Sequence, residues 1–409
     1  MNPRFLTASE INKSRFAAVT LLNLGTLSWF FVLNFYMGDI FAVMVPNNPI
    51  WGLYVGNSLV YGFAIFWSIT ISFISGRINR KKLLFTSIIL GIISTVLLGF
   101  LEGPVFAAIL ASLIGTSLGL VLPSSMALVA DYTIVENRGR VSGMIILSTF
   151  IVAFTSMAIY RMLDLNILGL ILLLAIIRST SLFALLIDKF DKPSTKGREK
   201  TRIPANAYRE LLFYLAPWVM FTIASSLALG LIPQKDYAPE LSLGNNLKYV
   251  LIAVFGLAAG FIADRFGRKQ PIILGLATLG IGYLLLGFNM SGISVIIYCA
   301  LSGVTWGLFF VIFLVVPGDL SIPSVREKFY ALGYILPLTG MFAIATIPGP
   351  IIPLPPSLIA QILGIFLFLA MYPVFRAKET LTESKRRERE MREYVERIGK
   401  TIQETEENG

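Results

Sequence analysis

Long apolar runs alternate with short polar segments along most of the chain. Twelve of the runs are long enough to cross a membrane, at about 16–38, 50–74, 83–101, 104–129, 141–160, 166–187, 210–232, 246–263, 270–289, 293–316, 329–347 and 355–374. A helix that crosses the hydrocarbon needs about 20 mostly apolar residues, because about 30 Å is covered at about 1.5 Å per residue. A backbone in lipid must also satisfy its own hydrogen bonds, which favours helices. The pattern therefore predicts an all-α membrane protein with twelve transmembrane helices.

The composition supports lipid as the solvent of these runs. Of the 409 residues, 56% are hydrophobic and 14% are charged, and the mean hydropathy is +0.75. A soluble domain has about 45–50% apolar and about 25% charged residues. The chain has no histidine and one cysteine, Cys299. These counts exclude a histidine relay, a histidine-based catalytic triad, an intrachain disulfide and a cysteine-based metal site, and we expect neither a metal nor a cofactor.

The polar segments predict how the chain is oriented. The first fifteen residues, MNPRFLTASEINKSR, are polar and contain Glu10, so we do not expect them to form a cleavable signal peptide. If the N-terminus is cytoplasmic, the short inner segments hold 14 lysines and arginines, and the outer side holds 3, namely Arg161, Lys235 and Lys248. Basic residues concentrate on the cytoplasmic side, so we expect a multi-pass protein of the plasma membrane with both termini in the cytoplasm. The net charge of +10 then faces anionic lipid headgroups and requires no nucleic-acid partner.

The chain resembles itself at an offset of 188 residues. From 56 to 138, 22 of 83 positions are identical to the residue 188 positions later, where apolar composition alone gives about seven. We therefore predict two parallel six-helix repeats: an N-terminal bundle over 1–187 and a C-terminal bundle over 210–375, joined by a cytoplasmic linker over 188–209. The charged tail, 376–409, is predicted to form a helix whose apolar face either docks on a surface or is solvated.

Two charged stretches lie at equivalent places in the repeats: GFIADRFGRK at 260–269 and a weaker copy, SFISGRINRK, at 72–81. The first matches the signature G-x-x-x-D-R-x-G-R-K of the major facilitator superfamily, through Gly260, Asp264, Arg265, Gly267, Arg268 and Lys269. The segment ADYTIVENRGR at 130–140 is similar to the family's loop between helices 4 and 5, which often reads D…E-x-R-G-R. Over nearly its whole length the chain therefore resembles a major facilitator superfamily (MFS) transporter.

The resemblance implies that the two bundles rock about a central cavity and expose it to each side in turn, while charged inner loops latch one of the two states. The candidate gating residues are Asp264, Arg265, Gly260, Gly267, Arg268, Lys269, Arg77, Arg80, Lys81, Asp131, Arg138, Asp319 and Arg326. The alternative for the basic residues is that they only fix the topology. The carboxylates favour the gate, because anions contribute little to the positive-inside rule. The copy at 72–81 has Gly76 where the motif has Asp, so the first-half latch is expected to be weaker or to use other residues.

The resemblance also implies that the helices at 16–38, 104–129, 210–232 and 293–316 face the cavity. Polar residues are costly in hydrocarbon and mark either a functional site or a helix contact. The candidate cavity residues are Asn23, Asn34, Tyr36, Asp39, Ser117, Ser124, Thr222, Ser225, Thr305 and Trp306. For each serine and threonine, the alternative is helix packing or a hydrogen bond to the i−4 carbonyl.

Two charged residues each allow two interpretations. Asp39 is the candidate carboxylate for coupling transport to protons, and the alternative is an exposed, ionised aspartate near the helix end. Arg178, the one charge deep inside an apolar run, is either a packing or snorkelling residue or a possible anion site. The packing interpretation is favoured because this helix is peripheral in the family.

These observations predict a secondary active transporter, a monomer in which a small solute moves by proton symport or by uniport. The alternatives are an exporter of apolar compounds and a non-transporting receptor or scaffold on the same fold. The glycine-proline signature of proton-antiporting exporters is missing from 141–160, which disfavours export. The chain has no histidine, no paired carboxylates at membrane depth and no ATP-binding loop, which argues against an enzyme and against a primary pump.

Overall fold

The computed structural model describes residues 13–74, 78–188, 190, 206–228, 231–233, 236–346, 354–381 and 391. These residues form thirteen α-helices: α1 (Lys13–Met44), α2 (Pro49–Ile74), α3 (Arg80–Leu97), α4 (Pro104–Asp131), α5 (Arg138–Met162), α6 (Ile167–Ile187), α7 (Ala207–Leu227), α8 (Ala238–Phe266), α9 (Lys269–Phe288), α10 (Gly292–Leu320), α11 (Arg326–Thr346), α12 (Pro356–Leu369) and α13 (Met371–Arg376). Every regular element within the described ranges is helical, as the apolar pattern predicts.

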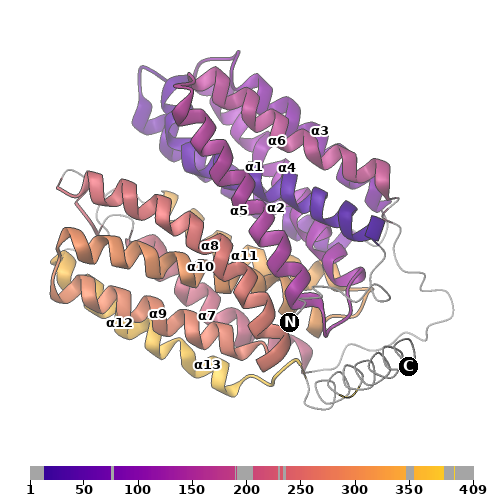
Figure 1. Ribbon diagram of the computed structural model, residues 1–409. Coiled ribbons are helices and arrows are strands. Elements are labelled where there is room, and N and C mark those ends of the chain that lie inside the picture. Colours follow the sequence, from indigo (N-terminus) through magenta and orange to yellow (C-terminus); the bar gives the residue numbers. More distant parts are fainter. Residues whose placement is uncertain are drawn as a thin grey trace, which may run out of the picture.

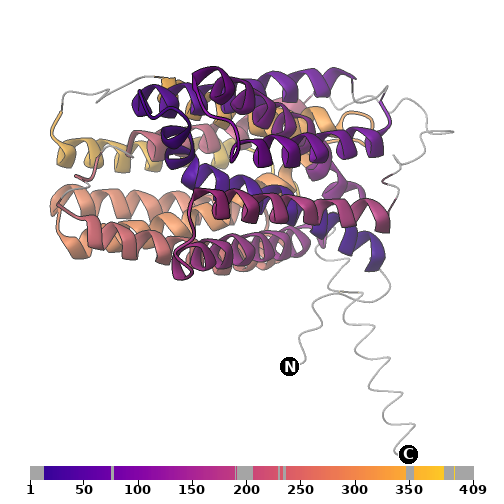
Figure 2. The same cartoon turned by 90° about the horizontal axis from the view of Figure 1, so that it is seen from above.

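The helices lie side by side in two groups, α1 to α6 and α7 to α13 (Figure 1). Seen from above, the long helices of both groups run roughly parallel to one another (Figure 2). The groups meet mainly where α5 packs along α8 and where α2 packs along α11. Buried apolar side chains form one large cluster in each group, and the cluster of the first group continues onto α8, α10 and α11.

Ten of the described helical segments are long and apolar enough to cross a membrane: α1, α2, α4 to α10, and α12 together with α13. The two others, α3 and α11, begin with charged turns, Arg80-Lys81-Lys82 and Arg326-Glu327-Lys328. The chain is therefore a multi-pass integral membrane protein. The full count of twelve spans and the division into two six-helix repeats stay predictions.

Several helices extend beyond the apolar runs that predict them. The helix α8 begins at Ala238, eight residues before the predicted start at 246, and α1 continues to Met44. Pro239 stands in the first turn of α8, where its fixed φ suits a helix start and its missing N–H leaves no bond unmade. Hydropathy misses such polar first turns because it registers apolar residues alone. Lys248, which the charge count assigns to the outer side, lies ten positions into α8, roughly 15 Å along the helix.

Small residues let α4 approach α2, and α10 approach α8, at equivalent points. A Cβ added to Gly115 of α4 would lie 2.4 Å from the carbonyl oxygen of Val60, and one added to Gly303 of α10 would lie 2.5 Å from that of Lys248. Each residue of the second pair stands 188 positions after its counterpart in the first. One turn further on, the same offset relates two more contacts, Gly119 against Ala64 and Gly307 against Ile252. The offset found in the sequence therefore recurs in the close helix contacts.

Candidate functional site

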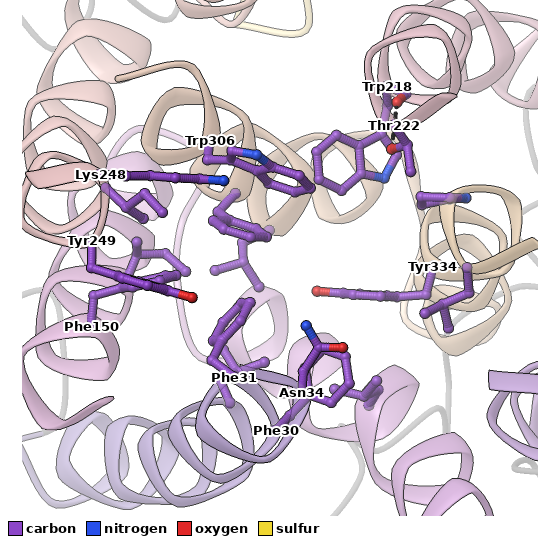
Figure 3. A pocket seen from close by; sticks show the side chains of 18 residues that line it. Phe30, Phe31, Asn34, Phe150, Trp218, Thr222, Lys248, Tyr249, Trp306 and Tyr334 are labelled. Carbon is purple, nitrogen blue, oxygen red and sulfur yellow. Dashed lines mark hydrogen bonds between the residues drawn. The ribbon is translucent and has the colours of Figure 1, made fainter. Parts of the chain in front are cut away.

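A cavity of about 170 Å³ lies between the two helix groups. Its lining comes from α1, α4 and α5 on one side and from α7, α8, α10 and α11 on the other. The lining includes eight aromatic residues: Phe30, Phe31, Phe150, Trp218, Tyr249, Trp306, Phe310 and Tyr334. Figure 3 shows these side chains surrounding a common space. The cavity is therefore a largely apolar chamber at the centre of the helix assembly.

Aromatic contacts connect the two helix groups across this cavity. The ring centroids of Phe31 on α1 and Phe310 on α10 are 5.1 Å apart, edge to face, and those of Phe150 on α5 and Phe310 are 5.6 Å apart. Within the second group, Trp218 and Trp306 meet edge to face at 5.7 Å. Such pairs contribute about 0.5–1.5 kcal/mol each beyond the area that they bury. They give the cavity an ordered apolar wall.

Few polar groups reach the cavity. Asn34 accepts a hydrogen bond from the hydroxyl of Tyr61, and the hydroxyl of Thr222 donates to the carbonyl oxygen of Trp218, 2.8 Å away, on its own helix. Among the described residues of the lining, Lys248 is the one charged side chain, and none is a carboxylate. The cavity therefore has a positive electrostatic character.

Three hydrogen-bond donors at the cavity are unpaired. The ammonium of Lys248 and the hydroxyls of Tyr249 and Tyr334 have no hydrogen bond or ion pair to any described residue. All three side chains are partly buried. In Figure 3 the hydroxyls of Tyr249 and Tyr334 point into the cavity from opposite sides, and Lys248 extends along the wall toward Trp306. These groups are available to a molecule that enters the cavity.

The structure divides the predicted cavity residues into two sets. Asn34, Thr222 and Trp306 lie in the lining. Thr305 instead donates to a carbonyl of α9 at 2.9 Å, and Ser117 donates to a carbonyl of α3 at 2.7 Å, so these two hydroxyls join helices. The remaining candidates stand outside the lining: the buried Asn23, Tyr36 and Ser124, the partly buried Ser225, and Asp39, which is exposed on α1.

Sequence reasoning misses Lys248, Tyr249 and Tyr334 as cavity residues. For Lys248 a signal is present in the repeat, where GNSLVY at 56–61 aligns with GNNLKY at 244–249. The alignment places Lys248 opposite Val60, so a cation replaces an apolar residue at the same position of an equivalent helix. Since the helix around Val60 packs without a charge at this position, Lys248 is not needed for the helix contact and indicates a function of the second half alone.

A cluster of ion pairs lies where α4 and α10 end and where α5 and α11 begin. This charged cluster consists of Arg80, Asp131, Arg138, Asp264, Arg268, Asp319, Arg326 and Glu327. Three of its ion pairs join one helix group to the other. Arg80 pairs with Glu327, and two further pairs are reciprocal: Arg138 donates to Asp319, and Arg326 donates to Asp131. The two arginines are 188 positions apart, and so are the two aspartates. Each helix group therefore donates from an arginine to the equivalent aspartate of the other group.

Each of these aspartates also pairs with an arginine of its own group. Nη1 of Arg80 lies 2.6 Å from Oδ2 of Asp131, and Nε of Arg268 lies 2.9 Å from Oδ2 of Asp319. Burial alone would lower the pKa of Arg268, but Asp319 and Asp264 raise that pKa above its ordinary value, so the guanidinium stays charged. Within the described ranges, no three His, Cys, Asp or Glu side chains are grouped so that they could hold a metal ion.

Asp264 connects the signature loop to the start of α5. It pairs with Arg268 at 2.8 Å and accepts hydrogen bonds from the backbone N–H groups of Gly139, at 2.9 Å, and Arg140, at 2.8 Å. The first N–H groups of a helix have no partner inside the helix, and a carboxylate also interacts favourably with this end of the helix dipole. Asp264 therefore attaches α8 of one group to α5 of the other.

The equivalent position in the first group is Gly76, which lies outside the described residues. Arg80 pairs instead with Glu327 at the start of α11, with 2.5 Å between Nη2 and Oε1. Both side chains are buried. At this position, a carboxylate of the other helix group therefore pairs with the motif's arginine.

Two glycines of the signature permit close approaches beside the charged cluster. A Cβ added to Gly260 of α8 would lie 2.4 Å from the carbonyl oxygen of Gly139 on α5, so the two backbones nearly touch. Gly267 has a φ of +109°, which side-chain-bearing residues rarely adopt, and a Cβ there would lie 2.6 Å from Glu379. Both positions require glycine for the geometry that is observed.

The segment after α13 attaches to the charged cluster. Glu379 accepts hydrogen bonds from the backbone N–H groups of Arg268 and Lys269, at 2.8 and 3.3 Å, at the start of α9. The hydroxyl of Thr380 donates to Asp319 at 3.1 Å. The apolar face that was predicted for the tail lies, apart from Met391, outside the described residues.

The other predicted gating residues lie at the edge of the cluster. Arg265 is exposed, and its guanidinium stands 5.5 Å from the ring centroid of Phe266. Lys81 is partly buried, in the first turn of α3. Arg77 lies outside the described residues. For Arg265 and Lys81 the structure shows no ion pair within the described ranges, which leaves the topological interpretation open for both.

Arg178 is completely buried in the first helix group. It donates to the hydroxyls of Thr26, at 2.7 Å, and Ser117, at 3.3 Å, and its guanidinium lies 4.8 Å from the ring centroid of Trp29. These partners belong to α1 and α4, so Arg178 holds α6 against both helices. It lies outside the lining of the central cavity.

Comparison with known proteins gives no match by sequence, either to a protein-family model or to a curated protein. Solved structures do match. The proton:xylose symporter XylE of the major facilitator superfamily, bound to 6-bromo-6-deoxy-D-glucose, aligns with a TM-score of 0.68 at 16% identity over 90% of this chain and 96% of its own. The human organic anion transporter MFSD10 aligns with a TM-score of 0.63 at 16% identity over 90% of this chain and 100% of its own. At such identity the likeness establishes the fold alone.

Proposed function

We propose that this chain, which has the fold of the major facilitator superfamily, is a secondary active transporter of a small solute. In this mechanism the α1–α6 and α7–α13 bundles rock against each other and expose the central cavity to one face of the membrane at a time. The proposal is supported by the position of the cavity between the two groups and by the lining that both groups contribute.

The observation that carries the proposal is the crosswise pairing at one end of the cavity. On α4, Asp131 follows the lining residue Leu122 by nine positions, roughly 14 Å along the helix. At this end, Arg138 and Asp319 bridge the groups in one direction, and Arg326 and Asp131 bridge them in the other. Closure at this end therefore depends on contacts that must separate if the bundles tilt apart.

Ion pairs suit a gate that opens and closes. A buried pair gains Coulomb energy but costs the hydration of both ions, so its net contribution to stability is small. When the bundles separate, water enters and hydrates Asp131, Asp319 and their arginines, which offsets the lost attraction. Two states of similar free energy result, as alternating access requires.

We place the charged cluster on the cytoplasmic side of the plasma membrane, because basic residues concentrate in the segments around it. The structure described here is then closed toward the cytoplasm. At the opposite end of the α5–α8 contact, Arg161 donates to Asn246 across 3.1 Å between exposed side chains, which is a weaker link.

A further question for the proposed transporter is whether the solute moves together with a proton. One structural neighbour is named a proton:xylose symporter, and the other an organic anion transporter. The described lining of this cavity holds no carboxylate that could carry a proton, and Asp39 lies outside it. Proton coupling would therefore use a group outside the described lining.

Labelling of a cavity cysteine from each face tests the proposed function. Asn34 lines the cavity and is exposed, so Asn34→Cys in a Cys299→Ala background provides a reporter thiol. We expect a membrane-impermeant maleimide to label it from the face opposite the charged cluster. Replacing both Asp131 and Asp319 by Asn removes the crosswise pairs and is expected to raise labelling from the cluster face by about tenfold or more, which corresponds to about 1.4 kcal/mol.

The matched control is Glu102→Gln, which removes an exposed carboxylate remote from the charged cluster and should leave the labelling pattern unchanged. If the reporter thiol is reached from one and the same face in the original protein and in the double variant, the bundles do not alternate, and the transport proposal fails.

A further inference from the structure

From the same cavity we infer the substrate class: a small organic anion whose apolar, ring-sized body lies among the aromatic side chains and whose carboxylate pairs with Lys248. This inference rests on the proposed transport function and adds to it the chemistry of the solute. Its evidence is the charge, the donors and the size of the cavity.

The charge of the cavity favours an anion over a cation as its ligand. Lys248 is the one charged residue of the described lining, and it has no ion pair or hydrogen bond to any described residue. Moving an ammonium out of water without a partner is costly, and proteins rarely retain such a charge unless it is compensated. A carboxylate in the cavity would compensate it, whereas a cationic solute would be repelled.

The hydrogen-bond donors of the cavity that lack partners also suit a carboxylate. Two tyrosine hydroxyls, those of Tyr249 and Tyr334, enter the cavity from opposite sides and lack partners among the described residues. The amide oxygen of Asn34, an acceptor in the same lining, already accepts from Tyr61. A carboxylate has two oxygens and accepts several hydrogen bonds, so it can use the ammonium and a hydroxyl together.

The size and polarity of the cavity restrict the rest of the ligand. A cavity of about 170 Å³ is comparable to the engineered cavity of about 150 Å³ that binds benzene. The wall offers ring faces and edges from Phe31, Phe310 and Trp306, which pack well against another ring. A sugar would leave several hydroxyls facing these rings without partners, and each unpaired polar group would cost about 1–3 kcal/mol.

Three probes of one shape and different charge test this inference. Benzoate is the anion, benzamide is its neutral counterpart and benzylammonium is a cation of similar size. We expect benzoate to raise the melting temperature of the purified full chain in nanodiscs, because a ligand that binds the folded state stabilises it. Benzamide and benzylammonium are expected to give little or no shift at equal concentration.

Substitutions locate the effect. Lys248→Gln should weaken benzoate binding by about tenfold to one-hundredfold, the range for loss of a charged hydrogen bond, and should abolish the preference for benzoate over benzamide. Lys248→Arg keeps the charge and should retain that preference. The control Lys82→Gln removes an exposed lysine at the start of α3 and should bind benzoate as the original protein does.

Equal shifts with benzoate and benzamide in the original protein would overturn the inference, as would unchanged benzoate preference in Lys248→Gln. If Lys248→Gln does not fold, the three probes on the original protein still decide the question. The two proposals can fail separately. If benzoate binds but the cavity thiol is reached from one face alone, the transport proposal fails. If the labelling alternates between faces but no preference for the anion is found, the inferred substrate class is wrong.

Discussion

At the scale of single residues, the protein neutralises its buried charges in one region and leaves a charge unpaired in another. In the charged cluster, Arg80 and Arg268 lie within 2.6–2.9 Å of an aspartate. In the cavity, Lys248 extends toward Trp306 and has no ion pair or hydrogen bond to a described residue. The paired charges can hold a conformation, whereas the unpaired charge is available to a ligand.

The two kinds of residue differ in how far the sequence reveals them. Asp264 and Arg268 belong to a contiguous signature, so they could be identified before their contacts were known. Lys248 has no signature, and its place in the cavity depends on where α8 begins. Tyr334 lies deep in an apolar run, where tyrosine is an ordinary residue, and only the packing of seven helices shows that its hydroxyl reaches the cavity.

The exposure of Asp39 leads to a prediction about proton coupling. Asp39 lies on α1, outside the cavity lining, with its side chain exposed. A group in this setting has no closed environment in which to exchange a proton with a substrate. We therefore expect Asp39→Asn to leave the pH dependence of Asn34→Cys labelling unchanged between acidic and neutral pH. A profile that is flattened by this substitution would restore Asp39 as the coupling carboxylate.

At the scale of helices, the hydropathy pattern predicts the elements well but misplaces their ends. The apolar runs correspond to helices because a lipid-facing backbone has few other options. The polar first turns, such as the one that follows Pro239 in α8, carry no hydropathy signal and extend the helices beyond the predicted bounds. The ion pair between α11 and α3 could not be predicted either. Glu327 and Arg80 are 247 positions apart in sequence and meet only because the two helix groups pack together.

Glu327 pairs with Arg80, whereas Asp264 pairs with the equivalent Arg268. This difference predicts that an aspartate placed at position 76 can restore stability when Glu327 is substituted. Glu327→Gln leaves the buried guanidinium of Arg80 with a weaker set of partners, and breaking a buried pair costs about 3–5 kcal/mol. We expect a lower melting temperature in nanodiscs. Adding Gly76→Asp restores the motif of the second half, in which Asp264 stands four positions before Arg268 and pairs with it. The double variant should recover most of the lost stability.

Two single variants of the same chain serve as controls for this rescue. Gly76→Asp alone adds a carboxylate four positions before Arg80, which already pairs with Asp131 and Glu327, and it should not stabilise the protein. Glu102→Gln removes a remote, exposed carboxylate and should change the melting temperature little. If Gly76→Asp fails to rescue Glu327→Gln while it is tolerated alone, the equivalence of the two halves of the cluster is wrong.

At the scale of the whole molecule, the offset of 188 residues appears both in the sequence and in the contacts. The offset of 188 relates Gly115 to Gly303 in the helix packing, and it relates Arg138 to Arg326 in the crosswise ion pairs. The fold could be predicted because the repeat, the apolar runs and the signature loops agree. The closed end could not be predicted, because under the proposed mechanism it depends on which of two packings of similar free energy the chain adopts.

Distances between the two bundles, measured by electron spin resonance at both ends of one protein, test the central claim most directly. Spin labels at Lys82 and Gln270, which are exposed and 188 positions apart, report on the end with the charged cluster. Labels at Phe106 and Ile293, also exposed, report on the opposite end. When Asp131 and Asp319 are replaced by Asn, we expect the first distance to lengthen and the second to shorten. Distances that stay fixed at both ends, or that lengthen together, would contradict a rocking pair of bundles.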